Sequence, residues 1–162
     1  MAKNRQQREM TSLGLYGLAP FALAAAALWT SPFVLPEHLA LDFHRIALVY
    51  GAVIVAYLSG AGAGATLAPA QKLQESFVPG QLIALAAFAA IVPDGVFFLS
   101  LGAVWRHVVI LVLLAYVLMR DLNATNAGLF PKWYGALRLR LTFWAGLFIV
   151  LIISRLLLWG YY

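Results

Sequence analysis

Arg106 and His107 stand side by side in the apolar stretch GAVWRHVVI, and they are the side chains best suited to chemistry. A charged residue at the centre of a bilayer costs about 2.5–3.5 kcal/mol on insertion scales, so such residues usually serve a function. If the preceding turn lies at Val92–Gly95, both residues lie deep in a helix. They then form a polar pathway, or a site where His107 ligates a haem iron or a chlorophyll magnesium. If the turn lies at Ser100–His107, they belong to an interfacial belt in which the arginine snorkels toward water.

The stretch Ser31–Arg45 holds further candidate ligands. On a helix that starts after Pro36, His38 and Asp42 share one face at a spacing of i, i+4, which can hold a metal ion. Only two ligands converge there, and the alternation of polar with apolar residues is typical of an amphipathic segment lying on a membrane. We therefore expect no metal site. We also expect no bis-histidine haem, because His38 and His44 both fall in this outer loop.

Catalysis is not expected from this chain. Cysteine is absent, which excludes thiolate nucleophiles, disulfides and thiolate metal sites. The apolar runs carry no paired carboxylates, since Asp94 and Asp121 fall on opposite sides of the membrane. The sequence motifs of serine hydrolases, zinc proteases and phosphate-binding loops are also missing. We therefore expect no catalytic residues.

The composition is that of a membrane protein. Of the 162 residues, 64% are hydrophobic and 10% are charged, and the mean hydropathy is +0.88. A soluble domain has about 25% charged residues, so the apolar surface must face lipid. Because a spanning helix needs about 20 apolar residues, the sequence predicts an all-α polytopic fold with about five transmembrane helices in a single domain, residues 1–162. Their expected ranges are Leu13–Thr30, Ile46–Ala68, Phe77–Val92, Val96–Met119 and Leu141–Trp159.

Two features of this map need a choice. The N-terminus resembles a signal peptide, with a basic segment before an apolar one, but we expect it to be retained as the first transmembrane helix, kinked at Pro20. We place the turn between the third and fourth helices at VPDG (Val92–Gly95), which joins proline, aspartate and glycine. The alternative break is near Ser100–His107.

Basic residues predict the orientation. Eight of the eleven lysines and arginines fall at one set of helix ends: Lys3, Arg5, Arg8, Lys72, Arg120, Lys132, Arg138 and Arg140. The positive-inside rule then places the N-terminus in the cytoplasm and the C-terminus in the periplasm. The expected location is a bacterial inner membrane, with the mitochondrial inner membrane as the alternative. The net charge of +5 reflects this concentration of basic residues at one side of the membrane. We therefore expect no nucleic-acid partner.

Small residues concentrate in the second apolar run. The members of this small-residue face are Gly60, Ala61, Gly62, Gly64 and Ala65. Lipid tails are as apolar as leucine, so helices in a membrane associate through close packing at such residues. We expect this face either to pack on the alanines of the first helix or to admit another helix or a chain-like ligand. Candidate ligands are a lipid, a carotenoid and the tail of a chlorophyll-type pigment.

Aromatic and basic residues cluster before the last apolar run. The set comprises Lys132, Trp133, Tyr134, Arg138 and Arg140. Tryptophan and tyrosine are typical of the membrane interface, and nearby cations bind lipid phosphates or a partner's carboxylate. An ordinary basic-aromatic anchor has the same composition, so both interpretations stay open.

The segments YGAVIVAYLSG (Tyr50–Gly60) and PKWYGALRLRLT (Pro131–Thr142), with Asp121 about ten residues before the second, carry a resemblance. They resemble a domain-of-unknown-function family of bacterial inner-membrane proteins that also includes a mitochondrial transmembrane protein. The pattern WYxxLRxxLT is its most specific part. The resemblance covers most of the chain and implies a topology rather than an activity. Members usually continue the first segment with a His-Trp pair, where this chain has Gly62 and Ala63, so any activity that depends on that histidine is lost here.

Two classes of function remain. The favoured hypothesis is a non-catalytic accessory or assembly subunit of a larger inner-membrane complex, photosynthetic or respiratory, with membrane lipids and other subunits as partners. The alternative is a carrier or channel for a small solute, an ion or a lipid, with Arg106 and His107 as its polar pathway.

Overall fold

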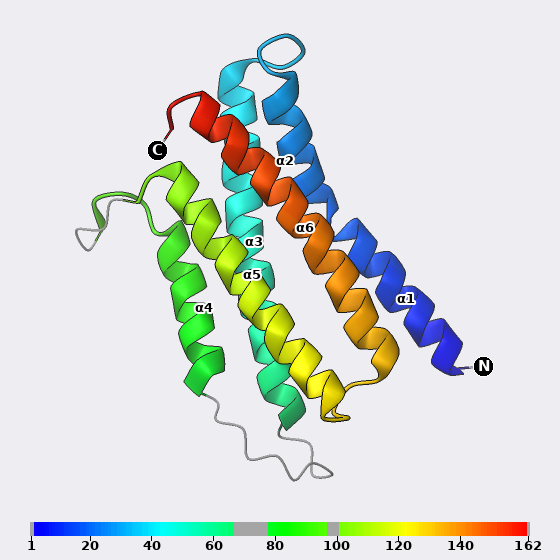
Figure 1. The fold of residues 1–162 in the computed structure, drawn as a ribbon. Coiled ribbons are helices and arrows are strands. Elements are labelled where there is room, and N and C mark those ends of the chain that lie inside the picture. The colour runs from blue at the N-terminus through cyan, green and yellow to red at the C-terminus, as the bar shows by residue number, and fades with distance from the viewer. Residues whose placement is uncertain (1, 67–77, 97–100, 162) are drawn as a thin grey trace.

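A computed structural model describes residues 2–66, 78–96 and 101–161 of the chain, and Figure 1 shows their arrangement. Within these ranges the long elements are all helices. They are α1 (Ala2–Tyr16), α2 (Ala19–Thr30), α3 (Glu37–Thr66), α4 (Val78–Ile91), α5 (Ala103–Asn126) and α6 (Lys132–Leu158).

Most of these helices are long and apolar enough to cross a membrane. Four stretches of the described chain qualify: Gln7–Thr30, Glu37–Gly64, Ala103–Asn126 and Lys132–Leu158. Helix α4 is apolar but has only 14 residues, about 21 Å of helix against a hydrocarbon thickness of about 30 Å. The protein is thus an all-α polytopic membrane protein, as the composition predicts.

Helices α1 and α2 run in the same direction, the helices from α2 to α6 alternate in direction, and the two termini lie at opposite ends of the molecule (Figure 1). We call the end that holds the N-terminus the inner end and the opposite end the outer end. Helix α3 is central and contacts α2, α4 and α5, while α6 packs on α2 and α5. The outer end carries the α2–α3 and α4–α5 connections, and the inner end carries the α5–α6 connection.

The first predicted helix is two helices, α1 and α2, separated at Gly17 and Leu18. Pro20 is the second residue of α2, and because proline has no N–H, the carbonyls of the preceding turn lose a donor. Tyr50 of α3 compensates, since its hydroxyl donates to the Gly17 carbonyl at 2.9 Å. The expected kink at Pro20 is therefore a break that a neighbouring helix stabilises.

Small residues bring α2, α3 and α5 together in the outer half of the molecule. An added Cβ at Gly51 would lie 2.9 Å from Ile110 and 3.4 Å from Phe21. Ala24 and Ala25 of α2 are buried in the same apolar core as Ala47 and Ala52 of α3. Because α2 begins at the level of Tyr50, the glycine-rich segment of α3 lies beyond its reach. The expected packing of that segment on the first helix is therefore wrong.

Three helices begin before their apolar runs, among them α1, which begins at Ala2 rather than Leu13. Helix α3 begins at Glu37 rather than Ile46, and α6 begins at Lys132 rather than Leu141. Backbone groups near the membrane must be hydrogen-bonded, so a helix continues through the polar residues that flank its apolar core. Hydropathy therefore marks the apolar core of a span and not the full helix.

The connection between α4 and α5 is longer than expected. Helix α4 ends at Ile91, but α5 begins at Ala103 instead of Val96. The favoured turn at Val92–Gly95 lies in this connection, whereas the alternative break at Ser100–His107 overlaps the start of α5. The expected helix boundaries at Ala68 and Phe77 lie outside the described residues.

The orientation of the helices is testable, because the chain has no native cysteine. Phe33, 93% exposed in the α2–α3 connection, lies at the outer end, and Ala127, exposed in the α5–α6 connection, lies at the inner end. In a bacterial inner membrane, the expected location, the positive-inside rule would place the outer end in the periplasm. We expect a membrane-impermeant thiol reagent to label F33C in intact spheroplasts and to label A127C only after lysis. The opposite pattern would invert the topology.

Candidate functional site

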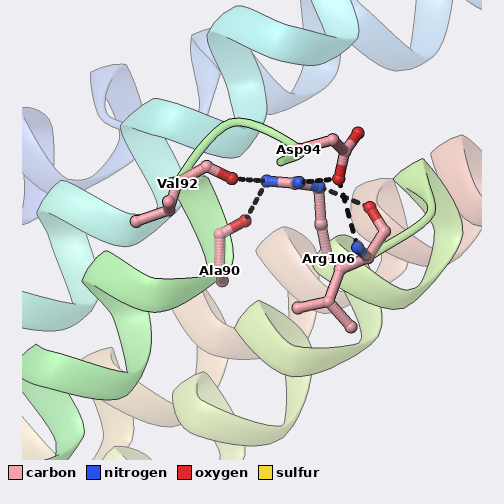
Figure 2. A network of polar contacts seen from close by, with 5 residues as sticks. Ala90, Val92, Asp94 and Arg106 are labelled. Carbon is pink, nitrogen blue, oxygen red and sulfur yellow. Dashed lines mark hydrogen bonds and ion pairs between the residues drawn. The ribbon is translucent and has the colours of Figure 1, made fainter. Parts of the chain in front are cut away.

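Arg106 lies in the first turn of α5 and joins it to the end of α4 (Figure 2). Its Nη1 donates to the carbonyl oxygens of Ala90 at 3.0 Å and Val92 at 2.5 Å. Its Nε donates to the Leu101 carbonyl at 2.7 Å, and Nη2 donates to Asp94 Oδ1 at 2.6 Å. All three guanidinium nitrogens are thus used within the chain.

This network has a clear physical role. The last carbonyls of a helix lack intrahelical donors and carry partial negative charge. Arg106, which is 8% exposed, supplies donors and positive charge to the end of α4. Asp94 pairs with Arg106, so this arginine has a carboxylate partner within its own chain. Arg106 thus ties the end of α4 to the start of α5, and the Leu101 N–H adds a bond to Asp94 Oδ1 at 3.1 Å.

Arg155 makes a similar arrangement at the same end of the molecule. It lies in the last turn of α6, and its Nε and Nη2 donate to the carbonyls of Leu28 at 3.1 Å and Ser31 at 2.8 Å. Its guanidinium also lies over the ring of Trp159, 4.5 Å from the centroid. Arg155 thereby satisfies the end of α2, as Arg106 satisfies the end of α4.

A buried ion pair joins α5 and α6 in the inner half. The Nε of Arg138 donates to Asp121 Oδ2 at 2.6 Å, and the two side chains are 8% and 7% exposed. The helices approach closely beside this pair, where an added Cβ at Gly135 would lie 3.0 Å from Thr125. Arg138 therefore links α6 to α5 through the hydrogen bond from its Nε to Asp121.

The other members of the basic-aromatic cluster lie on the same N-terminal part of α6 as Arg138. Lys132 and Arg140 are exposed, and Trp133 and Tyr134 are half-buried. The ring of Tyr134 packs against Phe130, with centroids 4.9 Å apart. The exposed cations lie in the part of α6 that is nearer the inner end.

The small-residue face of α3 is open. Among the described residues nothing lies within 4 Å of a Cβ added at Gly60 or Gly64. Gly62 differs, because its added Cβ would lie 3.8 Å from Arg120 Nη2. Ala61 is exposed, and the side chain of Ala65 lies outside the described part of the chain. The close contact of this segment with α4 is made next to the glycines, where Ser59 Oγ donates to the Gly80 carbonyl at 2.8 Å.

The structure brings two histidines together that the sequence placed apart. His44 lies in α3, not in a loop, and His107 lies in α5; their ring centroids are 5.5 Å apart. His44 is 5% exposed and His107 is 2% exposed. A haem or chlorophyll macrocycle on His107 would have to displace His44 in this arrangement. The i, i+4 spacing of His44 with Leu48, both on the buried side of α3, is the sequence signal that could have placed His44 in the core.

The His38 and Asp42 pair does not form a site. Both side chains are exposed, and Asp42 Oδ1 accepts a hydrogen bond from Arg45 Nη1 at 3.3 Å. In the described ranges, no three or more histidine, cysteine, aspartate or glutamate residues gather as a metal site would require.

Comparison with known proteins places this polytopic fold in a family. The chain matches the family described as "Protein of unknown function (DUF3429)" over residues 6–154, and it belongs to that family. Neither the curated proteins nor the solved structures contain a match. The membership agrees with the resemblance seen in the sequence.

The Arg106 network predicts unequal effects of its members. R106L leaves the Ala90, Val92 and Leu101 carbonyls without their donor, so we expect a loss of about 3 kcal/mol in the free energy of unfolding. D94N leaves those bonds intact, and Asp94 is 64% exposed, so its loss should stay below about 1 kcal/mol. Denaturation in mixed micelles, followed by circular dichroism, measures both. Equal effects would contradict the dominance of the carbonyl bonds.

The buried Asp121–Arg138 pair predicts strong coupling. Either D121L or R138L leaves a buried charge unpaired, and each should destabilise the protein by about 3–5 kcal/mol. The double variant removes both charges, so it should be more stable than either single variant. The same denaturation assay completes this double-mutant cycle, and additive losses would show that the pair is not coupled.

Proposed function

We propose that this protein is a non-catalytic accessory or assembly subunit of a larger complex in an inner membrane, photosynthetic or respiratory. The open small-residue face of α3 carries the proposal. Tyr57, Gly60, Ala61 and Gly64 follow one another at i, i+3, i+4 and i+7, which places them on one face of a helix. All four are exposed.

Such a face matters in a membrane because lipid provides no hydrophobic drive for helix association. Close approach of backbones at glycine and alanine supplies the packing energy instead. Within this chain the close approaches use other small residues, such as Gly51 against Ile110 and Gly135 against Thr125. Gly60 and Gly64 are left for a helix of another subunit, with Tyr57 beside them as an aromatic contact.

The buried charges support the same proposal. Arg106, Arg138 and Arg155 each bind a carboxylate or backbone carbonyls of this chain. A carrier needs polar groups that exchange partners with a solute, whereas these arginines hold helix ends and helix pairs together. The alternative carrier with Arg106 in its pathway therefore gains no support from the geometry.

The exposed cations at the inner end fit a subunit in contact with lipid. Lys132 and Arg140 stand beside the half-buried Trp133 and Tyr134, an arrangement typical of headgroup contact. We assign membrane lipids to this surface and a partner helix to the face of α3. The two surfaces belong to different helices and can be altered separately.

The proposal predicts a selective loss of association. The G60L/G64L double variant adds side chains where no described atom lies within 4 Å, so folding and insertion should be unchanged. The same side chains block close approach of a partner helix, and a stoichiometric complex purified in mild detergent should lose this subunit. A115L adds a leucine at an exposed position of α5 and should leave the complex intact.

The outcome is decided by composition and stoichiometry. A complex of fixed composition that contains the wild type and A115L but not G60L/G64L supports the proposal. A wild-type chain that purifies alone, or a complex indifferent to G60L/G64L, contradicts it.

A further inference from the structure

Helix α1 carries a polar hollow that neither the arginine networks nor the open face of α3 uses. The hollow has a volume of about 420 Å³ and is lined by Gln7, Arg8, Thr11 and Ser12. These positions follow one another at i, i+1, i+4 and i+5, which places them on one side of a helix. Because α1 begins at Ala2, all four lie beyond its first turn, and the hollow is formed by side chains.

The side chains of the hollow offer hydrogen-bond donors. Thr11 Oγ1 already donates to the Gln7 backbone carbonyl at 2.8 Å. The Arg8 guanidinium, the Ser12 hydroxyl and the Gln7 amide have no hydrogen-bond or ion-pair partner among the described residues. Glu9 of the same helix is engaged by Arg5, whose Nε lies 2.9 Å from Glu9 Oε1. Arg8 therefore has both charge and donors to offer a ligand.

The hollow lies where the chain enters the membrane. The first membrane-spanning stretch, Gln7–Thr30, has 24 residues, about 36 Å of helix against about 30 Å of hydrocarbon, so its ends reach the lipid headgroups. The residues that follow the hollow include the exposed apolar side chains of Leu13, Leu15 and Tyr16. Polar donors are thus followed by apolar surface, which is the order of groups along a phospholipid.

We propose that this hollow binds the phosphate of an anionic phospholipid in the leaflet at the inner end. The Arg8 guanidinium presents paired N–H donors that match two phosphate oxygens. The Ser12 hydroxyl and the Gln7 amide supply further donors, and Leu13 contacts the acyl chain. The site is separate from the lipid surface of α6 and does not depend on the subunit interface at α3.

Charge selects an anionic headgroup over a zwitterionic one. Phosphatidylcholine carries a cationic group, for which a carboxylate is the natural partner. The Glu9 carboxylate is paired with Arg5, and the described lining of the hollow holds no acidic side chain. The headgroup of phosphatidylglycerol carries hydroxyls instead, which can donate to Thr11 Oγ1 and to the amide oxygen of Gln7.

The test measures binding of phosphatidylglycerol to the full-length chain in a non-ionic detergent by native mass spectrometry. The parent protein carries K132Q/R140Q, which removes the exposed cations of the α6 surface. We expect it to bind phosphatidylglycerol in preference to phosphatidylcholine. R8Q should weaken this binding about tenfold, because charge-assisted hydrogen bonds to the phosphate are lost. Arg8 is exposed, so the helix content seen by circular dichroism should be unchanged.

R5Q in the same parent is the matched control. It removes one positive charge from the same helix, but Arg5 does not line the hollow, so binding should stay as in the parent. Equal weakening by R8Q and R5Q overturns the proposal, as does a folded R8Q protein that binds like the parent. Equal binding of phosphatidylcholine, or displacement of the lipid by inorganic phosphate at millimolar concentration, also contradicts it.

Discussion

The structure depends on the rule that a polar group in an apolar environment must find a partner. Backbone carbonyls at the ends of α2 and α4 have no donors within their own helices. Arg155 and Arg106 supply those donors from α6 and α5. Each arginine would be costly if it were alone in the same environment. The two deficits cancel, and the helix pairs α2–α6 and α4–α5 are thereby fixed relative to one another.

The same rule explains the inner half. Asp121 and Arg138 neutralise each other between α5 and α6. The small residue Gly135 of α6 lets that helix pack closely on Thr125 of α5. Arg106, Arg138 and Arg155 are therefore bound within the chain. The exposed glycines of α3 are not used in this way, and the proposed subunit interface rests on them.

Much of the fold follows from composition and periodicity. The apolar runs identify the spanning helices, the short third run corresponds to α4, and Pro20 marks the break between α1 and α2. The helix ends were less predictable, because hydropathy senses the apolar core while a helix ends where its last carbonyls are satisfied. The start of α5 at Ala103 is such a case, since it depends on Arg106 bonding back to α4.

The site divides in the same way. The sequence alone determined that Arg106 and His107 are unusual, that small residues concentrate in α3, and that the chain belongs in a membrane, because these properties follow from local residue types. Only the tertiary structure decided which partners those residues meet. Asp94 is 12 residues from Arg106 and Asp121 is 17 residues from Arg138, while His44 and His107 come from different helices. Such pairings depend on how helices cross, and the hydropathy of one segment carries no information about the face that another segment presents.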